Sequence, residues 1–253
     1  MIDCQIESKV ARITLNRPEK RNAINDQFIH SLQAALDRAA SEPSAAVTLI
    51  RAAGPDFCAG MDIAVLEQTA NSAALDHLEC ARVLGALYAG IRNHRHPVVA
   101  AVHGRALGGG CGLATACDIV LSAESAQFGY PEINLGFVPA LVMSMVRRCL
   151  HEKRAFELLV SGKPVRAREA LEIGLVTRVY PDSGFESSVA EYAAELAAKS
   201  APALALIKKL WRQTGEMPFD SALEAGAQVN AIARMTEDAR QGFQKFVAGK
   251  RKK

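Results

Sequence analysis

The sequence predicts an α/β fold in which helices cover the sheets, followed by a helical C-terminal region. Three observations lead to this prediction. Short β-rich runs alternate with helical patterns as far as about Phe185, which is typical of covered sheets. The run Pro97–Val102 is continuously apolar, as in a strand that is buried on both faces. Beyond Phe185 the pattern is wholly helical.

The first half of the chain alternates strands and helices. A strand is expected at Val10–Leu15, before the turn signal Asn16-Arg17-Pro18, and another at Val47–Ile50. Between them Asn25 is expected to cap a helix, whose apolar face carries Phe28, Ile29, Leu32, Ala35 and Leu36. Residues 62–95 form a helical pattern whose polar interval, Glu67–Asn71, is where helical order is expected to be lost.

The second half continues the alternation and then becomes helical. Further short strands are predicted at Ile119–Leu121, Gln127–Phe128 and Val176–Val179, and helices at Leu141–Leu150, Lys153–Val160 and Ala167–Ile173. From Pro202 onward the helices carry much apolar surface, in stripes that begin with Leu204, Ile207, Leu210 and Trp211. We therefore expect this region to pack against the core or against a neighbouring subunit.

Composition and charge exclude several classes of protein. A chain of 253 residues with 49% hydrophobic and 23% charged residues fits a globular protein of one large domain, or of a domain with an appendage. The net charge of +3 is too small to suggest a nucleic-acid partner. No apolar stretch approaches the ~20 residues of a membrane span, and no secretory signal is visible. The six cysteines form no C-x-x-C pair, so we expect reduced, buried thiols in a cytoplasmic protein.

The stretch Val102–Phe137 carries the pattern around which the rest of the chain is organised. A predicted strand feeds the glycine cluster Gly108–Gly112, a small-residue helical run follows, and Glu132 comes later in an apolar neighbourhood. Glycines let a backbone approach a ligand closely, and a helix start presents free N–H groups. Such donors beside one carboxylate can stabilise an oxyanion while a proton moves. Taken alone, the same glycines also fit a tight turn for close helix packing.

A second segment, Asp56–Ile63, is another small-residue turn, in which Asp62 signals a helix start. Together with GRALGGGCGLATACDI, FGYPEINLGF and the opening NRPEKRNAIN, it gives the sequence a pattern that resembles the enoyl-CoA hydratase/isomerase (crotonase) family over roughly residues 10 to 250. The resemblance implies a spiral of β-β-α units over residues 1–200, although no internal sequence repeat is visible. It also implies that residues 201–253 are a helical trimerisation region, in a homotrimer or a hexamer of paired trimers.

The resemblance also implies roles for particular residues. The backbone N–H groups of Met61 and Gly109 match the two donors of the family's oxyanion hole, and Glu132 matches its proton-handling carboxylate. Burial should raise the pKa of Glu132 toward neutrality. Contacts to the CoA thioester transfer to Arg21, Ala23, Ala59, Asp62, Ile63 and Lys250. Asp62 also fits a simple helix cap, and Lys250 also fits a solvated basic tail. CoA is part of the substrate, and no metal or organic cofactor is expected.

The sequence departs from the hydratase pattern at Gly112, because typical hydratases carry a second glutamate there. Glu132 is then the one carboxylate that the motifs place at the reacting carbons. One carboxylate suffices to carry a proton from C2 to C4, so a Δ3,Δ2-enoyl-CoA isomerase is the alternative to a hydratase. In contrast, the combination of GGGCGLATACDI, a strand that carries Tyr130 and Glu132, and the following GFVPALV resembles a methylglutaconyl-CoA-hydratase-like branch. A catalytically silent acyl-CoA-binding oligomer is the alternative from another class. A metal at His94 and His96 is a further, weaker hypothesis.

Overall fold

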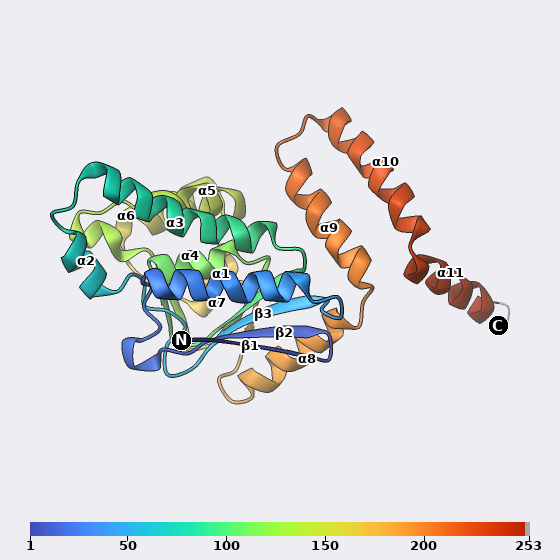
Figure 1. Cartoon of the computed structure of the whole chain (residues 1–253), viewed down its shortest axis with the longest axis horizontal. Coiled ribbons are helices and arrows are strands. Elements are labelled where there is room, and N and C mark those ends of the chain that lie inside the picture. The colour runs from blue at the N-terminus through green and yellow to red at the C-terminus, as the bar shows by residue number, and fades with distance from the viewer. Residues whose placement is uncertain (251–253) are drawn as a thin grey trace.

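A computed structural model describes residues 1–250, which form two β-sheets surrounded by helices (Figure 1). The larger sheet has the strand order β1 (Ile2–Glu7), β2 (Val10–Leu15), β3 (Val47–Ala52), β4 (Val98–Val102), β6 (Ile119–Ala123) and β9 (Arg178–Tyr180). Its β1–β2 pair is antiparallel and its other pairs are parallel. The smaller sheet consists of β5 (Arg105–Leu107), β7 (Gln127–Gly129) and β8 (Val165–Arg166).

Helices connect these strands and then continue alone. The first set comprises α1 (Asp26–Ser41), α2 (Ile63–Thr69), α3 (Ala74–Asn93), α4 (Gly109–Ala116), α5 (Ala140–Cys149), α6 (Glu152–Ser161) and α7 (Ala167–Glu172). The C-terminal set comprises α8 (Phe185–Ala197), α9 (Ala201–Thr214), α10 (Phe219–Met235) and α11 (Glu237–Lys250). Two short 3₁₀-helices, η1 (Pro18–Lys20) and η2 (Pro131–Leu135), lie in loops.

The chain winds between the two sheets as a spiral. It passes from β4 in the larger sheet to β5 in the smaller one, returns through α4 to β6, and passes again to β7. The preceding turn has the same form, because Cys58, after β3, makes a parallel bridge to Ala106 of β5. Each turn is therefore a strand in one sheet, a strand or bridge in the other, and a helix. This arrangement confirms the spiral of β-β-α units.

The predicted buried strand is confirmed as β4, all of whose residues are buried. Val98, Ala100 and Val102 face one hydrophobic cluster, and Val99 and Ala101 face a second cluster on the other side of the sheet. The predicted apolar face of α1 is also buried, and the Asn25 side chain caps that helix by accepting the Phe28 N–H. The continuous apolar run of β4 exists because helices cover both faces of the sheet.

Several elements differ from the sequence-based expectations. The helical pattern of residues 62–95 divides into α2 and α3, and the break at residues 70–73 overlaps the end of the predicted polar interval, Glu67–Asn71. Glu132 lies on the 3₁₀-helix η2 and not on a strand. The sequence analysis missed β1, although Ile2, Cys4 and Ile6 alternate with polar residues along it. It also missed β5 and β8, because two or three residues leave little periodicity. Cys58, Cys111 and Cys117 are buried as expected, whereas Cys80 and Cys149 are exposed.

Of the C-terminal helices, α8 packs on the larger sheet, and the chain leaves the core from α9 onward (Figure 1). α9 is attached to it through Lys208, whose Nζ lies 2.7 Å from Asp118 Oδ2. α10 folds back along α9, and α11 continues farther from the sheets. Large apolar side chains on α10 and α11 are exposed, with Phe219 at 75%, Met235 at 71% and Phe243 at 69%. None of the helices within residues 1–250 has the length and apolar composition that a membrane span requires.

Candidate active site

The glycine cluster forms the sharp turn from β5 into α4. Gly108 has φ 52° and ψ −124°, a conformation that side chains with a Cβ rarely adopt. A Cβ on Gly110 would lie 2.2 Å from the Cys58 carbonyl oxygen, so glycine allows α4 to pack directly against that segment. The Gly108 N–H donates to the Gly129 carbonyl at 2.8 Å, which ties the turn to β7. The structure therefore uses the glycines both for a tight turn and for close helix packing.

Two backbone N–H groups make no hydrogen bond within the described part of the chain, one at this turn and one on the segment that ends at Met61. Gly109 is the first residue of α4, where an N–H has no intrahelical acceptor. Met61 lies in a parallel bridge to Ile24, whose two hydrogen bonds use Gly60 and Asp62 and leave the Met61 N–H free. A Cβ on Gly60 would lie 3.8 Å from the Gly109 nitrogen. The turn before Met61 thus approaches the start of α4, as an oxyanion hole made of these two donors requires.

Glu132 faces the same turn from η2. Its Oε1 would lie 3.3 Å from a Cβ on Gly108, so the carboxylate reaches the glycine turn itself. Its Oε2 is buried and has no hydrogen-bond partner among the described residues. Burial raises the pKa of Glu132, and its own backbone N–H opposes that rise only in part. The carboxylate is therefore partly desolvated and has no cation of the described residues beside it to compensate its charge, which suits a group that takes up and releases a proton.

Other buried carboxylates in the core are paired. Asp56 accepts a bidentate bond from Arg105, at 2.8 Å for both contacts, and this bond lowers the pKa of Asp56. Asp62 lies 2.7 Å from Arg17. Burial would raise the pKa of Asp62, but Arg17 and the Ala64 N–H outweigh that effect and lower it. Paired carboxylates of this kind are typical of structural roles.

The positions expected to contact CoA come together next to Met61. The Ala59 N–H donates to the Arg21 carbonyl at 3.0 Å, and Ile24 and Asp62 continue the same parallel pairing. Arg21 is exposed, as is Ile63 at the start of α2, whereas Ala23 and Asp62 are buried. The Asp62 carboxylate caps α2 and binds Arg17, so it is not a free anion. Lys250 falls outside the residues whose side chains the structure describes.

The sequence patterns did not single out the residues that hold these two segments together. Asn22 is fully buried, and its side-chain amide donates to the Ala53 and Asp56 carbonyls, at 2.9 Å each. Arg17 donates to the Ala23 carbonyl at 3.2 Å in addition to its ion pair with Asp62. Both residues lie in the NRPEKRN motif, so the motif itself was the available signal. Their function is to fix the 21–24 segment beside residues 59–62.

The space at position 112 is occupied. A Cβ on Gly112 would lie 2.5 Å from Tyr88 Oη, 2.7 Å from Tyr88 Cζ and 2.9 Å from Val142 Cγ1. Tyr88 is buried on α3 and donates its hydroxyl hydrogen to the Gly109 carbonyl at 2.9 Å. A glutamate at position 112 therefore has no room in this fold. The sequence showed that the second carboxylate is missing, and the structure identifies the side chain that fills its place.

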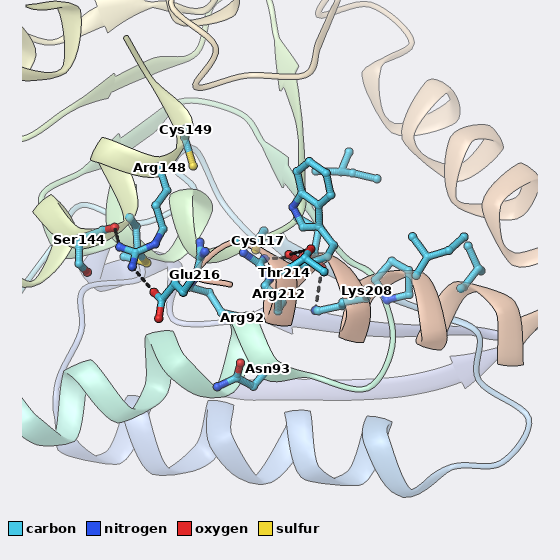
Figure 2. Close-up of a pocket in the computed structure, with 18 of the residues that line it drawn as sticks. Arg92, Asn93, Cys117, Ser144, Arg148, Cys149, Lys208, Arg212, Thr214 and Glu216 are labelled. Atoms are coloured by element: carbon cyan, nitrogen blue, oxygen red, sulfur yellow. Dashed lines mark hydrogen bonds and ion pairs between the residues drawn. The ribbon is translucent and has the colours of Figure 1, made fainter. Parts of the chain in front are cut away.

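A cleft of about 1160 Å³ lies away from Glu132, between α9 and the core. Figure 2 shows Arg92, Arg148 and Arg212 among the residues that line it, with Arg148 paired with Glu216. Arg212 also pairs with Asp118, at 2.6 Å. Exposed Ile207 and Trp211 of α9 also line it, but none of the predicted site residues whose side chains are described does. Its lining comes from α9 and from the part of the core that α9 faces, and not from the glycine turn.

The histidine pair near this cleft has its own hydrogen bonds. The His96 N–H donates to His94 Nδ1 at 3.1 Å, which leaves His94 Nε2 to donate to the Leu36 carbonyl at 3.1 Å. Burial lowers the pKa of both imidazoles, that of His96 to about 4. Among the described residues, no three His, Cys, Asp or Glu side chains cluster in a way that could hold a metal ion. The structure therefore describes these histidines as buried structural groups.

Comparisons with known proteins agree with this geometry. A family model described as "Enoyl-CoA hydratase/isomerase" matches residues 5–253. The chain is 33% identical over 246 residues to the 2,3-dehydroadipyl-CoA hydratase of Escherichia coli, covering 95% of this chain and 93% of that protein. The crystal structure of an enoyl-CoA hydratase from Mycobacterium smegmatis superposes with a TM-score of 0.94 at 28% identity, covering 98% and 96% of the two chains.

Human enoyl-CoA hydratase domain-containing protein 3 superposes similarly. Its TM-score is 0.92 at 27% identity, and the match covers 98% of this chain and 97% of the other. These likenesses extend over the whole spiral and into the C-terminal helices. They confirm the predicted family and fold and the prediction of an enzyme of the hydratase/isomerase class. The chain belongs to the enoyl-CoA hydratase/isomerase family.

Proposed function

We propose that this enzyme hydrates a 2-enoyl-CoA thioester, with Glu132 moving the proton and the N–H groups of Met61 and Gly109 binding the thioester oxygen. One observation carries the proposal. Glu132 has a buried oxygen without a partner beside a turn that also presents a free N–H at Gly109. Asp56 and Asp62, by contrast, are each paired with an arginine.

The steps of the reaction follow from these positions. The Glu132 carboxylate accepts a proton from water as the water oxygen bonds to C3, and the double-bond electrons move toward the thioester. The developing negative charge on the thioester oxygen is stabilised by the two N–H donors, which need no protonation and stay fixed by the fold. The protonated Glu132 then delivers that proton to C2. The product is a 3-hydroxyacyl-CoA, and Glu132 returns to its ionised form.

The test is Glu132→Gln, which keeps the shape of the side chain but cannot exchange a proton. We expect affinity for the CoA thioester to persist and turnover to fall by ~10²–10⁴. The assay uses crotonyl-CoA, 3-methylglutaconyl-CoA and 2,3-dehydroadipyl-CoA, the last because a relative carries that name. If Glu132→Gln hydrates these thioesters as fast as the parent, the mechanism is wrong. If the parent protein binds CoA but turns over none of these thioesters, it would instead be a catalytically silent acyl-CoA-binding protein.

The isomerase alternative is favoured by one observation, which is that Tyr88 excludes a second carboxylate at position 112. A proton can move from C2 to C4 on Glu132 alone, without water addition. Turnover in water labelled with a heavy oxygen isotope separates the two reactions. A hydratase places the labelled oxygen at C3, whereas an isomerase acting on a 3-enoyl-CoA gives a 2-enoyl product without it.

We further propose that the enzyme works as a homotrimer or hexamer assembled through residues 201–253. The exposed apolar side chains of α10 and α11 support this, because monomeric soluble proteins rarely expose such large apolar patches. Light scattering at micromolar concentration is the test, and a monomer would contradict the proposal. If the enzyme assembles in this way, deleting residues from Glu216 onward removes α10 and α11 and should give aggregation or unfolding. The CoA contacts of Arg21, Ala23, Ala59, Asp62, Ile63 and Lys250, and a cytoplasmic location, remain predictions.

A further inference from the structure

Tyr88 brings an oxygen to the place that a side chain at position 112 would otherwise reach. It belongs to α3, and its ring crosses to the first turns of α4, where its Oη would lie 2.5 Å from a Cβ on Gly112. That separation is close to the one between Cβ and the carboxyl carbon within a glutamate side chain. The phenol therefore does more than fill space, because it places an oxygen near the position that the carboxyl group of a glutamate at residue 112 would occupy.

The hydrogen-bonding capacity of this phenol is only partly used. Its one hydrogen is donated to the Gly109 carbonyl at 2.9 Å, and a phenol oxygen can accept hydrogen bonds as well. The residue is only 3% exposed, and burial raises the pKa of Tyr88 well above its usual value, so the hydroxyl stays neutral. What it can still offer to a bound molecule is a lone pair.

Glu132 and Tyr88 approach consecutive residues of the same turn. Glu132 Oε1 would lie 3.3 Å from a Cβ on Gly108, and Tyr88 Oη would lie 3.4 Å from a Cβ on Gly109. The other oxygen of Glu132 is buried and unpartnered. Two oxygens with free accepting capacity thus flank the peptide that presents the Gly109 N–H.

We propose that Tyr88 is a catalytic residue of hydration, whose oxygen accepts a hydrogen bond from the water that Glu132 deprotonates. The inference rests on the proposed hydratase function. The water gives one hydrogen to Glu132 and points the other at Tyr88, which directs an oxygen lone pair to C3. As the O–C3 bond forms, the first hydrogen moves to Glu132 and then to C2. The second hydrogen stays on the product hydroxyl, so Tyr88 neither gains nor loses a proton.

The test is Tyr88→Phe, which removes the oxygen and keeps the ring that packs against α4. Loss of one hydrogen bond to the reacting water should lower kcat by ~10-fold or more while KM stays unchanged. The matched control is Tyr130→Phe, which also removes a buried hydroxyl bonded to α4, at 2.7 Å from Thr115 Oγ1. Thermal melts of both variants measure the stability change that loss of a buried hydroxyl causes. The control should melt like Tyr88→Phe and keep the parent kcat.

A second measurement separates this role from an indirect effect through Gly109. An arylacryloyl-CoA absorbs at longer wavelength when hydrogen bonds polarise its thioester carbonyl, so its bound spectrum reports the N–H donors directly. We expect Tyr88→Phe to keep the full red shift. Loss of the red shift together with kcat would overturn the water-binding role and make Tyr88 a positioning residue for Gly109.

Two further outcomes keep the inference separate from the proposed function. A kcat of Tyr88→Phe equal to that of Tyr130→Phe would overturn the role of Tyr88. The proposed hydratase would nevertheless stand, provided Glu132→Gln is inactive. If the parent protein hydrates no enoyl-CoA, the function itself fails, and the role of Tyr88 fails with it.

Discussion

Glu132 and Asp118 are two carboxylates withdrawn from solvent in regions of opposite character. Asp118 lies at the start of β6 and accepts from Arg212 at 2.6 Å, from Lys208 at 2.7 Å and from the Val98 N–H at 2.7 Å. Glu132 lies on η2 beside the glycine turn, and its buried oxygen has no partner. Both carboxylates are partly withdrawn from solvent, but the core compensates only the Asp118 charge.

The fold compensates the carboxylate that joins secondary-structure elements, Asp118, and leaves uncompensated the carboxylate that we propose for chemistry, Glu132. Lys208 also donates to the Ile91 and His96 carbonyls, at 3.1 and 3.0 Å, so the Asp118 cluster joins α9 to the ends of α3 and β4. Removing one partner from such a cluster leaves an uncompensated buried charge. At Glu132 the uncompensated state already exists in the folded protein, which suits the proton exchange that we propose for this carboxylate. Four substitutions test or sharpen this contrast, from the largest expected effect to the smallest.

Asp118→Asn should give the largest loss of stability. It leaves Lys208 and Arg212 without their anion, so we expect the free energy of unfolding to fall by ~3–5 kcal/mol. Denaturant titration measures the change. Glu124→Gln is the control, because Glu124 pairs with Arg168 in an exposed ion pair, and such pairs contribute ~0–1 kcal/mol. If the two variants lose equal stability, the Asp118 cluster is not the joint described here.

Met61→Pro tests the region around Glu132, where the backbone N–H groups of Met61 and Gly109 make no hydrogen bond within the described residues and are proposed to bind the thioester oxygen. Proline removes the Met61 N–H, which makes no bond within the described residues. Turnover should fall by ~10²–10³ if this donor binds the thioester oxygen. Met61→Ala keeps the N–H and should retain most of the activity. Equal losses in both variants would mean that the side chain, and not the donor, matters.

Gly112→Ala tests how tightly Tyr88 fills the site. A single added Cβ would meet Tyr88 Oη at 2.5 Å, and overpacking of this kind typically costs ~1–3 kcal/mol. Activity should fall as well, because the ring must move. Gly226→Ala on α10 is the control, because its Cβ would meet nothing within 4 Å and alanine favours a helix by ~0.5–1 kcal/mol. The clash also means that Gly112→Glu cannot restore a second carboxylate, although the absence of the glutamate from the sequence makes this substitution the obvious one to try.

Glu132→Gln should raise stability slightly at neutral pH although it removes activity. Because folding raises the pKa of Glu132, the folded state binds more protons than the unfolded chain just above the carboxyl's ordinary value of 4.5. Parent stability therefore falls as pH rises through the folded pKa, whereas the amide has no charge to desolvate. The melting-temperature difference should be largest at neutral pH and vanish below pH 4.5. A variant less stable than the parent at pH 7 would contradict the idea that the carboxylate is uncompensated.

The sequence predicted the long elements and the family well because these depend on local patterns. The apolar run of β4 and the cap and buried face of α1 follow from residue type and spacing, and the structure confirms them. The glycine motif at residues 108–112 and the segment around Met61 predicted that these two stretches of backbone would lie close together. Short strands such as β5 and β8 were missed, because pairing with distant residues and not local periodicity forms them.

The sequence by itself determined the family, and through that resemblance it predicted the spiral and Glu132 as the one carboxylate of the motifs, because few other folds share these motifs. The tertiary structure decided which charges are compensated, since Arg17, Arg105 and Arg212 reach their carboxylates from distant parts of the chain. It also decided what stands in place of the second glutamate. Tyr88 lies 24 residues before Gly112 on another helix, and only the packing of α3 on α4 brings its hydroxyl to that position.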